Sequence, residues 1–271
     1  MLGSGSWIQS VGRSGTPDMR LVCFPYAGGS SGAFKGWAAH LDNVEVLAVQ
    51  LPGRSERIGE PACTRMDVVL QQLKSELAYS HSLPTVYYGH SMGAVIAFEL
   101  ALIVDASVRP TALVLSGRTA PSSKRPRQMH DLPQHELFSS VRTFGGMPDA
   151  VFESADLMQM LETVLRADFK LLETWKESAG RRIDIPLLCA AGSADLVACV
   201  NDVGRWRQHA AADFQLRVFD GDHFFIQKSE IEFVRHLNRD LQYLRERRQR
   251  EMKAGEQRHV AIQANHIYQG S

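Results

Sequence analysis

Residues 85–102 read TVYYGHSMGAVIAFELAL and contain the pentapeptide Gly89-His90-Ser91-Met92-Gly93. The β-branched and aromatic residues before the pentapeptide predict a buried strand. The apolar helix formers after it predict a helix. A serine on a tight turn between a strand and a helix is held clear of the chain, where its hydroxyl can act as a nucleophile. We therefore predict that Ser91 is a nucleophile and that the flanking glycines make room for the turn.

Strand-like and helix-like runs alternate on both sides of this stretch, which predicts a mostly parallel central sheet flanked by helices. The predicted strands cover 20–24, 44–50, 85–89, 112–116, 186–191 and 214–219. The predicted helices between them cover 33–41, 66–79, 92–104, 201–208 and 229–248. We expect a flexible leader over 1–18, one α/β domain over 19–250 and a polar C-terminal tail over 251–271.

The alternation stops over residues 118–182, where helical patterns at 133–144 and 156–175 follow a loop rich in proline, serine and basic residues. A helical insertion after a sheet strand is placed where a lid would cover a site at the sheet edge. The alternative is an extra helical layer far from the chemistry. We expect the lid.

The bulk composition excludes several classes of partner and site. The 271 residues carry a formal net charge of zero, which gives no electrostatic reason to expect nucleic acid or an anionic membrane as a partner. No apolar run is long enough to cross a bilayer, and the leader lacks a signal core. The four cysteines have no metal-like spacing; Cys23 and Cys189, in predicted strands, indicate buried free thiols in a cytoplasmic protein.

A serine nucleophile needs a histidine base and an acid that orients it. His223 follows the last predicted strand, at the carboxyl edge of the sheet and in the chain order serine, acid, histidine. The segment directly after 112–116, residues 117–121, includes no carboxylate, whereas the turn after 186–191 delivers Asp195, our preferred acid. Other candidates for the acid are Asp202, Asp220 and Asp222.

The oxyanion of a tetrahedral intermediate needs two backbone N–H donors. Met92, directly after the serine at the helix N-terminus, supplies one of them. The second is expected from the loop after the first strand, Phe24-Pro25-Tyr26-Ala27-Gly28-Gly29, where we assign the Ala27 N–H. A phosphate-binding role for Gly28-Gly29 is disfavoured, because the G-x-G-x-x-G and Lys-Ser/Thr patterns are absent.

Five motifs now resemble one family, the type II thioesterases of nonribosomal peptide and polyketide synthesis. They are Phe24-Pro25-Tyr26-Ala27-Gly28-Gly29, Gln50-Leu51-Pro52-Gly53-Arg54, Gly89-His90-Ser91-Met92-Gly93, Leu165-Arg166-Ala167-Asp168-Phe169 and Gly221-Asp222-His223-Phe224-Phe225. The resemblance spans about 20–244 and implies an α/β-hydrolase fold with a helical lid. Two departures are the missing proline after Asp195 and the carboxylate of Asp222 where glycine is common.

The resemblance implies hydrolysis of acyl groups from the phosphopantetheine arm of acyl- or peptidyl-carrier protein domains, in pathways that make compounds such as antibiotics or siderophores. It implies Ser91, His223 and Asp195 as the triad, with Ala27 and Met92 as oxyanion donors. No cofactor or metal is implied, because the phosphopantetheine belongs to the partner. We expect a monomer. The alternatives are an esterase or acyl-CoA thioesterase acting on small free substrates and a noncatalytic scaffold.

The acyl pocket is the least determined part of the site. Candidates for its lining are Tyr26, Phe144, Met147, Met158 and Phe169. At helical spacing the insertion's apolar residues are also suited to packing the lid against the sheet. The basic residues Lys124, Arg125 and Arg127 could meet an acidic carrier, or simply form a solvated loop.

Overall fold

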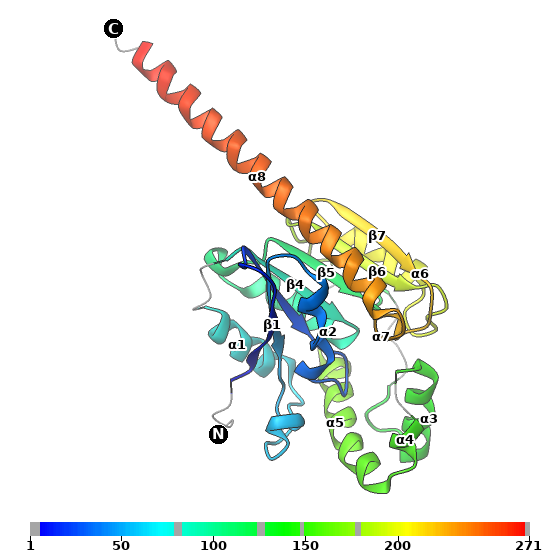
Figure 1. The fold of residues 1–271 in the computed structure, drawn as a ribbon. Coiled ribbons are helices and arrows are strands. Elements are labelled where there is room, and N and C mark those ends of the chain that lie inside the picture. Colours follow the sequence, from blue (N-terminus) through cyan, green and yellow to red (C-terminus); the bar gives the residue numbers. More distant parts are fainter. Residues whose placement is uncertain (1–5, 79–82, 124–127, 147–148, 177–179, 269–271) are drawn as a thin grey trace.

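The central sheet has seven strands in the order β1-β3-β2-β4-β5-β6-β7 (Figure 1). The computed structural model describes residues 6–78, 83–123, 128–146, 149–176 and 180–268. The strands are β1 (Ile8–Arg13), β2 (Met19–Phe24), β3 (Val44–Val49), β4 (Thr85–His90), β5 (Ala112–Ser116), β6 (Leu187–Gly192) and β7 (Phe214–Phe219). Every neighbouring pair is parallel except β1 with β3. The predicted α/β class with a mostly parallel sheet is confirmed.

The helices follow the predicted alternation, with differences at 33–41, at 201–208, where a 3-10 segment follows a short α-helix, and at the last helix. They are α1 (Met66–Leu77), α2 (Met92–Ile103), α3 (Gln134–Phe144), α4 (Asp149–Phe152), α5 (Ala155–Thr174), α6 (Val200–Gly204), α7 (Phe225–Lys228) and α8 (Glu230–Tyr268). The helix predicted over 33–41 is instead two 3-10 turns, Ser31–Phe34 and Trp37–His40. Gly36 lies between them with a φ of 95°, which no continuous right-handed helix accommodates.

Both faces of the sheet are covered, so its central strands are apolar throughout. On β4, Tyr87 packs with residues of α1 and α2, such as Leu73 and Phe98. The next residue, Tyr88, points to the other face and lies against Phe233 of α8, with ring centroids 5.6 Å apart. The alternation of side chains along one strand therefore serves two separate cores.

Residues 8–13 correct the prediction of a flexible leader, because they form β1 and pair antiparallel with β3. The preceding Trp7 is buried, and its backbone N–H donates to both carboxylate oxygens of Glu76, at 2.9 and 3.0 Å. The side chains of β1 are only half-buried or exposed, so this strand needs little apolar sequence. The polar composition of this segment therefore disguised it.

The last helix also differs from expectation. α8 continues to Tyr268, past the predicted helix end at 248 and through most of the expected tail, and Figure 1 shows it projecting beyond the sheet. Ion pairs one helical turn apart, Arg247–Glu251 at 2.8 Å and Arg250–Glu246 at 3.6 Å, suit a solvent-exposed helix. Among the described residues, we find no helix with both the length and the apolarity needed to cross a bilayer.

The insertion is helical, as predicted, with α3, α4 and α5 grouped at one side of the sheet (Figure 1). It has its own small core, formed by Met129, Leu137, Phe138, Val141 and Leu165. Ala27, from the loop after β2, packs against this core. The lid therefore contacts the segment that was predicted to supply an oxyanion donor.

Candidate active site

Ser91 lies on the turn between β4 and α2 and adopts a strained backbone conformation, with φ 52° and ψ −112°. Its N–H donates to the Ser116 carbonyl at 2.9 Å, which ties the turn to β5. The turn also passes very close to the loop after β2, because a Cβ on Gly93 would lie 1.9 Å from the Phe24 carbonyl oxygen. Only glycine fits there, which explains the pentapeptide's last residue.

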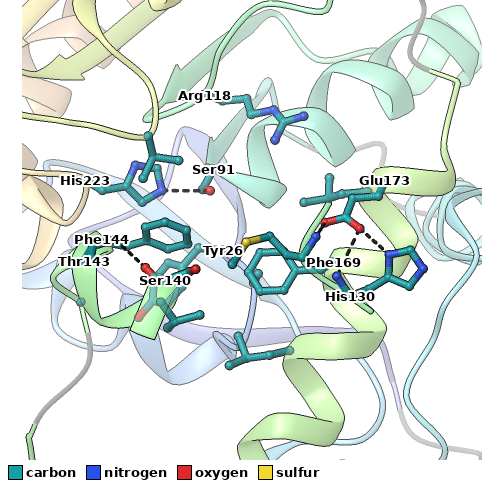
Figure 2. A pocket seen from close by; sticks show the side chains of 18 of the residues that line it. Tyr26, Ser91, Arg118, His130, Ser140, Thr143, Phe144, Phe169, Glu173 and His223 are labelled. Carbon is teal, nitrogen blue, oxygen red and sulfur yellow. Dashed lines mark hydrogen bonds and ion pairs between the residues drawn. The ribbon is translucent and has the colours of Figure 1, made fainter. Parts of the chain in front are cut away.

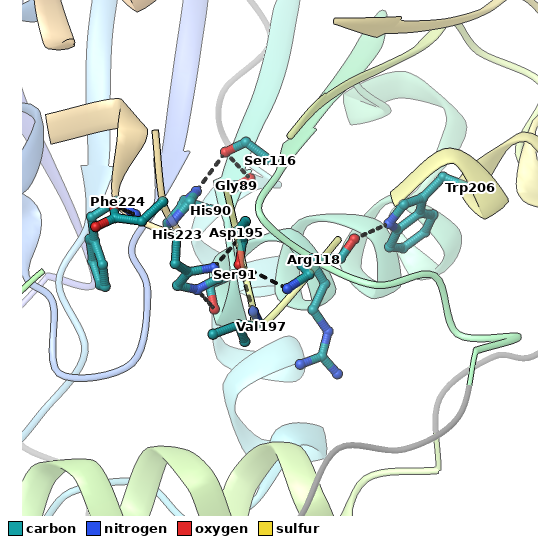
Figure 3. A network of polar contacts seen from close by, with 12 residues as sticks. Gly89, His90, Ser91, Ser116, Arg118, Asp195, Val197, Trp206, His223 and Phe224 are labelled. Atoms are coloured by element: carbon teal, nitrogen blue, oxygen red, sulfur yellow. Dashed lines mark hydrogen bonds and ion pairs between the residues drawn. The ribbon is translucent and has the colours of Figure 1, made fainter. Parts of the chain in front are cut away.

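His223 reaches Ser91 from the loop after β7. Its Nε2 is 3.0 Å from the Ser91 Oγ and its Nδ1 is 2.8 Å from the Asp195 Oδ2 (Figure 3). A carboxylate can only accept hydrogen bonds, so Nδ1 carries the proton and Nε2 is left to accept from the serine hydroxyl. Ser91, His223 and Asp195, from three distant parts of the chain, thus form one chain of hydrogen bonds, which we call the relay.

Asp195 is held by backbone groups of its own turn. Its Oδ1 accepts hydrogen bonds from the N–H groups of Val197 at 2.7 Å and Ala198 at 2.9 Å. Its side chain is fully buried. These two donors orient the carboxylate, so the proline that often follows this aspartate in related sequences is not needed here.

The other candidate acids have different partners. The Asp202 Oδ2 accepts from the Cys199 thiol at 3.2 Å, and the Asp220 Oδ1 accepts from the Ser193 hydroxyl at 2.9 Å. Asp222 accepts from the Phe224 N–H at 3.0 Å and pairs with Lys228 at 2.5 Å. The geometry therefore favours Asp195.

His90 is buried directly behind this relay. Its Nδ1 is 2.8 Å from the Ser116 Oγ, and its ring centroid is 5.0 Å from that of His223. Burial and the neighbouring His223 lower the pKa of His90 well below its ordinary value of 6.5. His90 is therefore a neutral packing residue of the native state.

This burial predicts a loss of stability in acid. The pKa of His90 is lower in the folded state, so the unfolded state binds more protons below pH 6.5. The stabilisation is complete above that pH and falls as the pH drops toward the folded pKa, by up to about 1.4 kcal/mol per pH unit. Urea unfolding at falling pH should show a shallower dependence in His90→Gln. The exposed His135 provides the control, since His135→Gln should keep the native dependence; an unchanged slope in His90→Gln would contradict this account.

The two predicted oxyanion donors come from the start of α2 and from the loop after β2. Met92 is the first residue of α2, and the first N–H groups of a helix have no partner within it. In the loop after β2, the Gly28 N–H donates to Asp168 at 2.8 Å and the Gly29 N–H donates to the Tyr26 carbonyl at 2.9 Å. The N–H groups that follow Ala27 are therefore already bonded, which favours Ala27 as the second donor.

Ser91 and His223 open into a cavity of about 970 Å³ beneath the lid (Figure 2). Apolar residues of α3 and α5 line much of it, namely Val141, Phe144, Leu161, Leu165, Phe169 and Leu172. Polar and charged side chains line another part, including Arg118, Gln128, His130 and Glu173. The cavity can therefore accept an acyl group that is mostly apolar.

Three of the five predicted pocket residues, Tyr26, Phe144 and Phe169, line this cavity. The Phe144 ring lies edge-on to His223, with centroids 5.9 Å apart. Met158 packs with the lid core instead, and is not among the residues that line the cavity. Met147 lies outside the described residues, as do Lys124, Arg125 and Arg127.

Sequence analysis did not predict the polar side chains that line part of the cavity. The Glu173 carboxylate of α5 accepts from the N–H groups of Met129 at 2.6 Å and His130 at 3.3 Å, and it bonds the His130 ring. These contacts tie the loop before α3 to α5. They join residues more than forty positions apart, and no sequence spacing signals them.

Comparisons with known proteins identify the family. A family model described as a thioesterase domain matches residues 19–241. Linear gramicidin dehydrogenase LgrE of Brevibacillus parabrevis is 33% identical over 87% of this chain and 92% of its own length. Thioesterase PikA5 of Streptomyces venezuelae is 33% identical over 82% of this chain and 81% of its own.

Among solved structures, YbtT, a type II thioesterase from the yersiniabactin NRPS/PKS biosynthetic pathway, superimposes with a TM-score of 0.79. It is 28% identical, and the match covers 88% of this chain and 99% of YbtT. The matched family model extends over strands β2 to β7, the lid and the loops that hold Ser91, Asp195 and His223. The chain therefore belongs to the thioesterase domain family, and its predicted resemblance to the type II thioesterases is confirmed.

Proposed function

We propose that this protein is a serine thioesterase that hydrolyses acyl groups from the phosphopantetheine arm of carrier-protein domains in nonribosomal peptide or polyketide assembly lines. The observation that carries the proposal is the Ser91–His223–Asp195 relay, which opens into the cavity under the lid. The cavity provides room for the acyl group beside the reacting hydroxyl. Removal of stalled acyl groups and release of an intermediate both use this chemistry.

In the first half of the reaction, the Ser91 Oγ attacks the thioester carbonyl carbon while the His223 Nε2 takes the hydroxyl proton. The N–H groups of Ala27 and Met92 stabilise the oxyanion that forms. The intermediate collapses by breaking the carbon–sulfur bond, and His223 returns the proton to the departing thiol. Asp195 stabilises the imidazolium that exists between these two transfers.

In the second half, water replaces the thiol. The His223 Nε2 takes a proton from the water as its oxygen attacks the acyl-enzyme carbonyl, and then gives that proton to the Ser91 Oγ as the ester bond breaks. The products are a free carboxylic acid and the carrier with a free thiol. The proposed chemistry is complete with this chain's residues and water.

Relatives support the carrier as the substrate class, since YbtT is described as a type II thioesterase from an NRPS/PKS biosynthetic pathway and PikA5 is named a thioesterase. The name of LgrE instead states a dehydrogenase. We do not extend that activity to this chain, because the sequence contains no G-x-G-x-x-G dinucleotide fingerprint.

If carrier proteins are the substrates, the enzyme should prefer one of two thioesters that share the phosphopantetheine arm. Acyl-CoA and the acylated carrier protein both present phosphopantetheine, so a difference between them isolates contacts with the carrier protein. We expect kcat/KM to be at least about tenfold higher on the carrier, equivalent to about 1.4 kcal/mol of added binding in the transition state. Steady-state hydrolysis with one acyl group on both substrates measures this ratio. Equal efficiencies would assign the protein to acyl-CoA or small-ester hydrolysis instead.

A further inference from the structure

A buried ion pair connects the lid to the loop after β2. Asp168 of α5 is completely buried, and Arg54, from the loop after β3, is almost so. The guanidinium donates two hydrogen bonds to the carboxylate, from Nη1 to Oδ2 at 2.6 Å and from Nη2 to Oδ1 at 2.7 Å. The sequence motifs that contain these residues carried the family resemblance, but the sequence assigned neither residue a role.

The same pair forms hydrogen bonds with two consecutive residues of the loop after β2, which we call the oxyanion loop. The Asp168 Oδ2 accepts the Gly28 N–H at 2.8 Å, and the Arg54 Nη1 donates to the Gly29 carbonyl at 3.3 Å. Gly28 has a φ of +77°, a conformation that costs glycine little, and an added Cβ would lie 3.1 Å from the Leu165 side chain of α5. The loop and the lid helix therefore meet without a gap.

A buried ion pair is a poor source of net stability, because removing both charges from water offsets most of their attraction. A two-bond arginine–carboxylate contact does, however, fix distance and direction closely. Here the ion pair fixes the orientation of the peptide group between Ala27 and Gly28. That group is next to the Ala27 N–H, which would face the oxyanion. Preorganised donors are effective because they need no rearrangement during the reaction.

We propose that Asp168 and Arg54 are positioning residues of the oxyanion hole, which hold the Ala27 N–H in place and link that donor to the lid helix α5. This inference rests on the proposed serine thioesterase mechanism. Neither side chain touches the acyl group or the reacting atoms; both act through the backbone of the loop. Damage to the pair should therefore weaken transition-state binding more than substrate binding.

The double variant R54M/D168L tests this directly. It removes the hydrogen bonds to Gly28 and Gly29 but leaves no unpaired charge in the core, so we expect a folded protein. On a small acyl thioester, kcat should fall by about 10- to 100-fold, since a displaced donor costs less than the ~10²–10³-fold of a deleted one. KM should stay within about twofold of the native value. The inhibition constant of an alkylboronic acid, which places a tetrahedral oxyanion in the hole, should rise by the same factor as kcat falls.

Arg54→Lys is the second variant, because it keeps the charge in the core but loses the two-bond geometry. It should show the same pattern with a smaller fall in kcat. Arg166→Gln is the matched control on the same helix. Arg166 ties α5 to the segment before α3 through the carbonyls of His130 and Leu132, each at 2.8 Å, and its hydrogen bonds within the described part of the chain do not reach the oxyanion loop. Its kcat and boronic acid inhibition should be native.

Three results would overturn the inference: native kcat in either folded variant, a loss that appears in KM with unchanged boronic acid inhibition, or an equal loss in Arg166→Gln. Each of these leaves the serine mechanism standing if Ser91→Ala is inactive. Turnover by Ser91→Ala would instead reject the proposed function itself, so the two failures are distinguishable.

Discussion

Ser91→Ala is expected to be inactive on an acylated carrier protein, with kcat lowered by about 10⁴- to 10⁶-fold. The variant lacks the oxygen that forms the acyl-enzyme, and a methyl group occupies its place on the strained turn. Intact-protein mass spectrometry should show a covalent acyl adduct on the native enzyme during turnover and none on the variant. A fluorophosphonate probe, which needs the same activated serine, should label only the native protein.

The control for this result is Ser10→Ala, on the exposed side of β1, which should retain native turnover and labelling. The substitution at position 91 adds no bulk, so both variants should unfold at temperatures near that of the native protein. Hydrolysis at the native rate by Ser91→Ala would mean that another nucleophile carries the reaction, and would reject the relay.

Asp195→Asn is expected to lower kcat by about 10⁴-fold while leaving the fold intact. The Oδ1 of this side chain accepts from the N–H groups of Val197 and Ala198, so an asparagine keeps its oxygen there. Its amide nitrogen then faces the His223 Nδ1, where Asp195 now offers Oδ2. A donor at that position makes Nδ1 the acceptor and puts the proton on Nε2, which can no longer take a proton from Ser91.

Single-turnover acylation kinetics should show this loss in the first chemical step, with little change in KM. Asp220→Asn is the matched control, because Asp220 lies nearby on the same sheet edge but bonds the Ser193 hydroxyl. If Asp195→Asn lost less than about tenfold, orientation of the histidine by Asp195 would not be important to the reaction.

Local sequence carried enough information for six of the seven strands and for Ser91. The stretch from Thr85 to Leu102 combines a doubly buried strand, two obligatory glycines and an apolar helix, and each of these has a short-range signature. His223 and Asp195 could also be inferred, because the carboxyl ends of parallel strands meet at one edge. The same logic led to the prediction of Ala27, from the loop after β2, as an oxyanion donor.

Elements stabilised by partners were harder to anticipate. β1 depends on pairing with β3, on the burial of Trp7 in the core and on the hydrogen bond from the Trp7 backbone N–H to Glu76, and its own polar residues give no strand signal. The charged end of α8 looked like a tail because its helix-forming pairs resemble ordinary solvated charge. The pocket side chains were only partly identified, since Met158 and Phe169 lie on nearly the same face of one helix but at different positions along its axis, and only Phe169 reaches the cavity.

Sequence alone thus establishes the fold class, the elbow at Ser91 and the order of the residues around it, because these follow from short-range patterns and from the rules of parallel sheets. Only the tertiary structure shows which acid faces His223, which side chains line the cavity, and that Asp168 and Arg54 join the lid to the oxyanion loop. Asp168 and Gly28 are 140 positions apart in the chain. Contacts over such separations depend on how whole elements pack, and a linear pattern of residues does not encode the direction in which each side chain finally points.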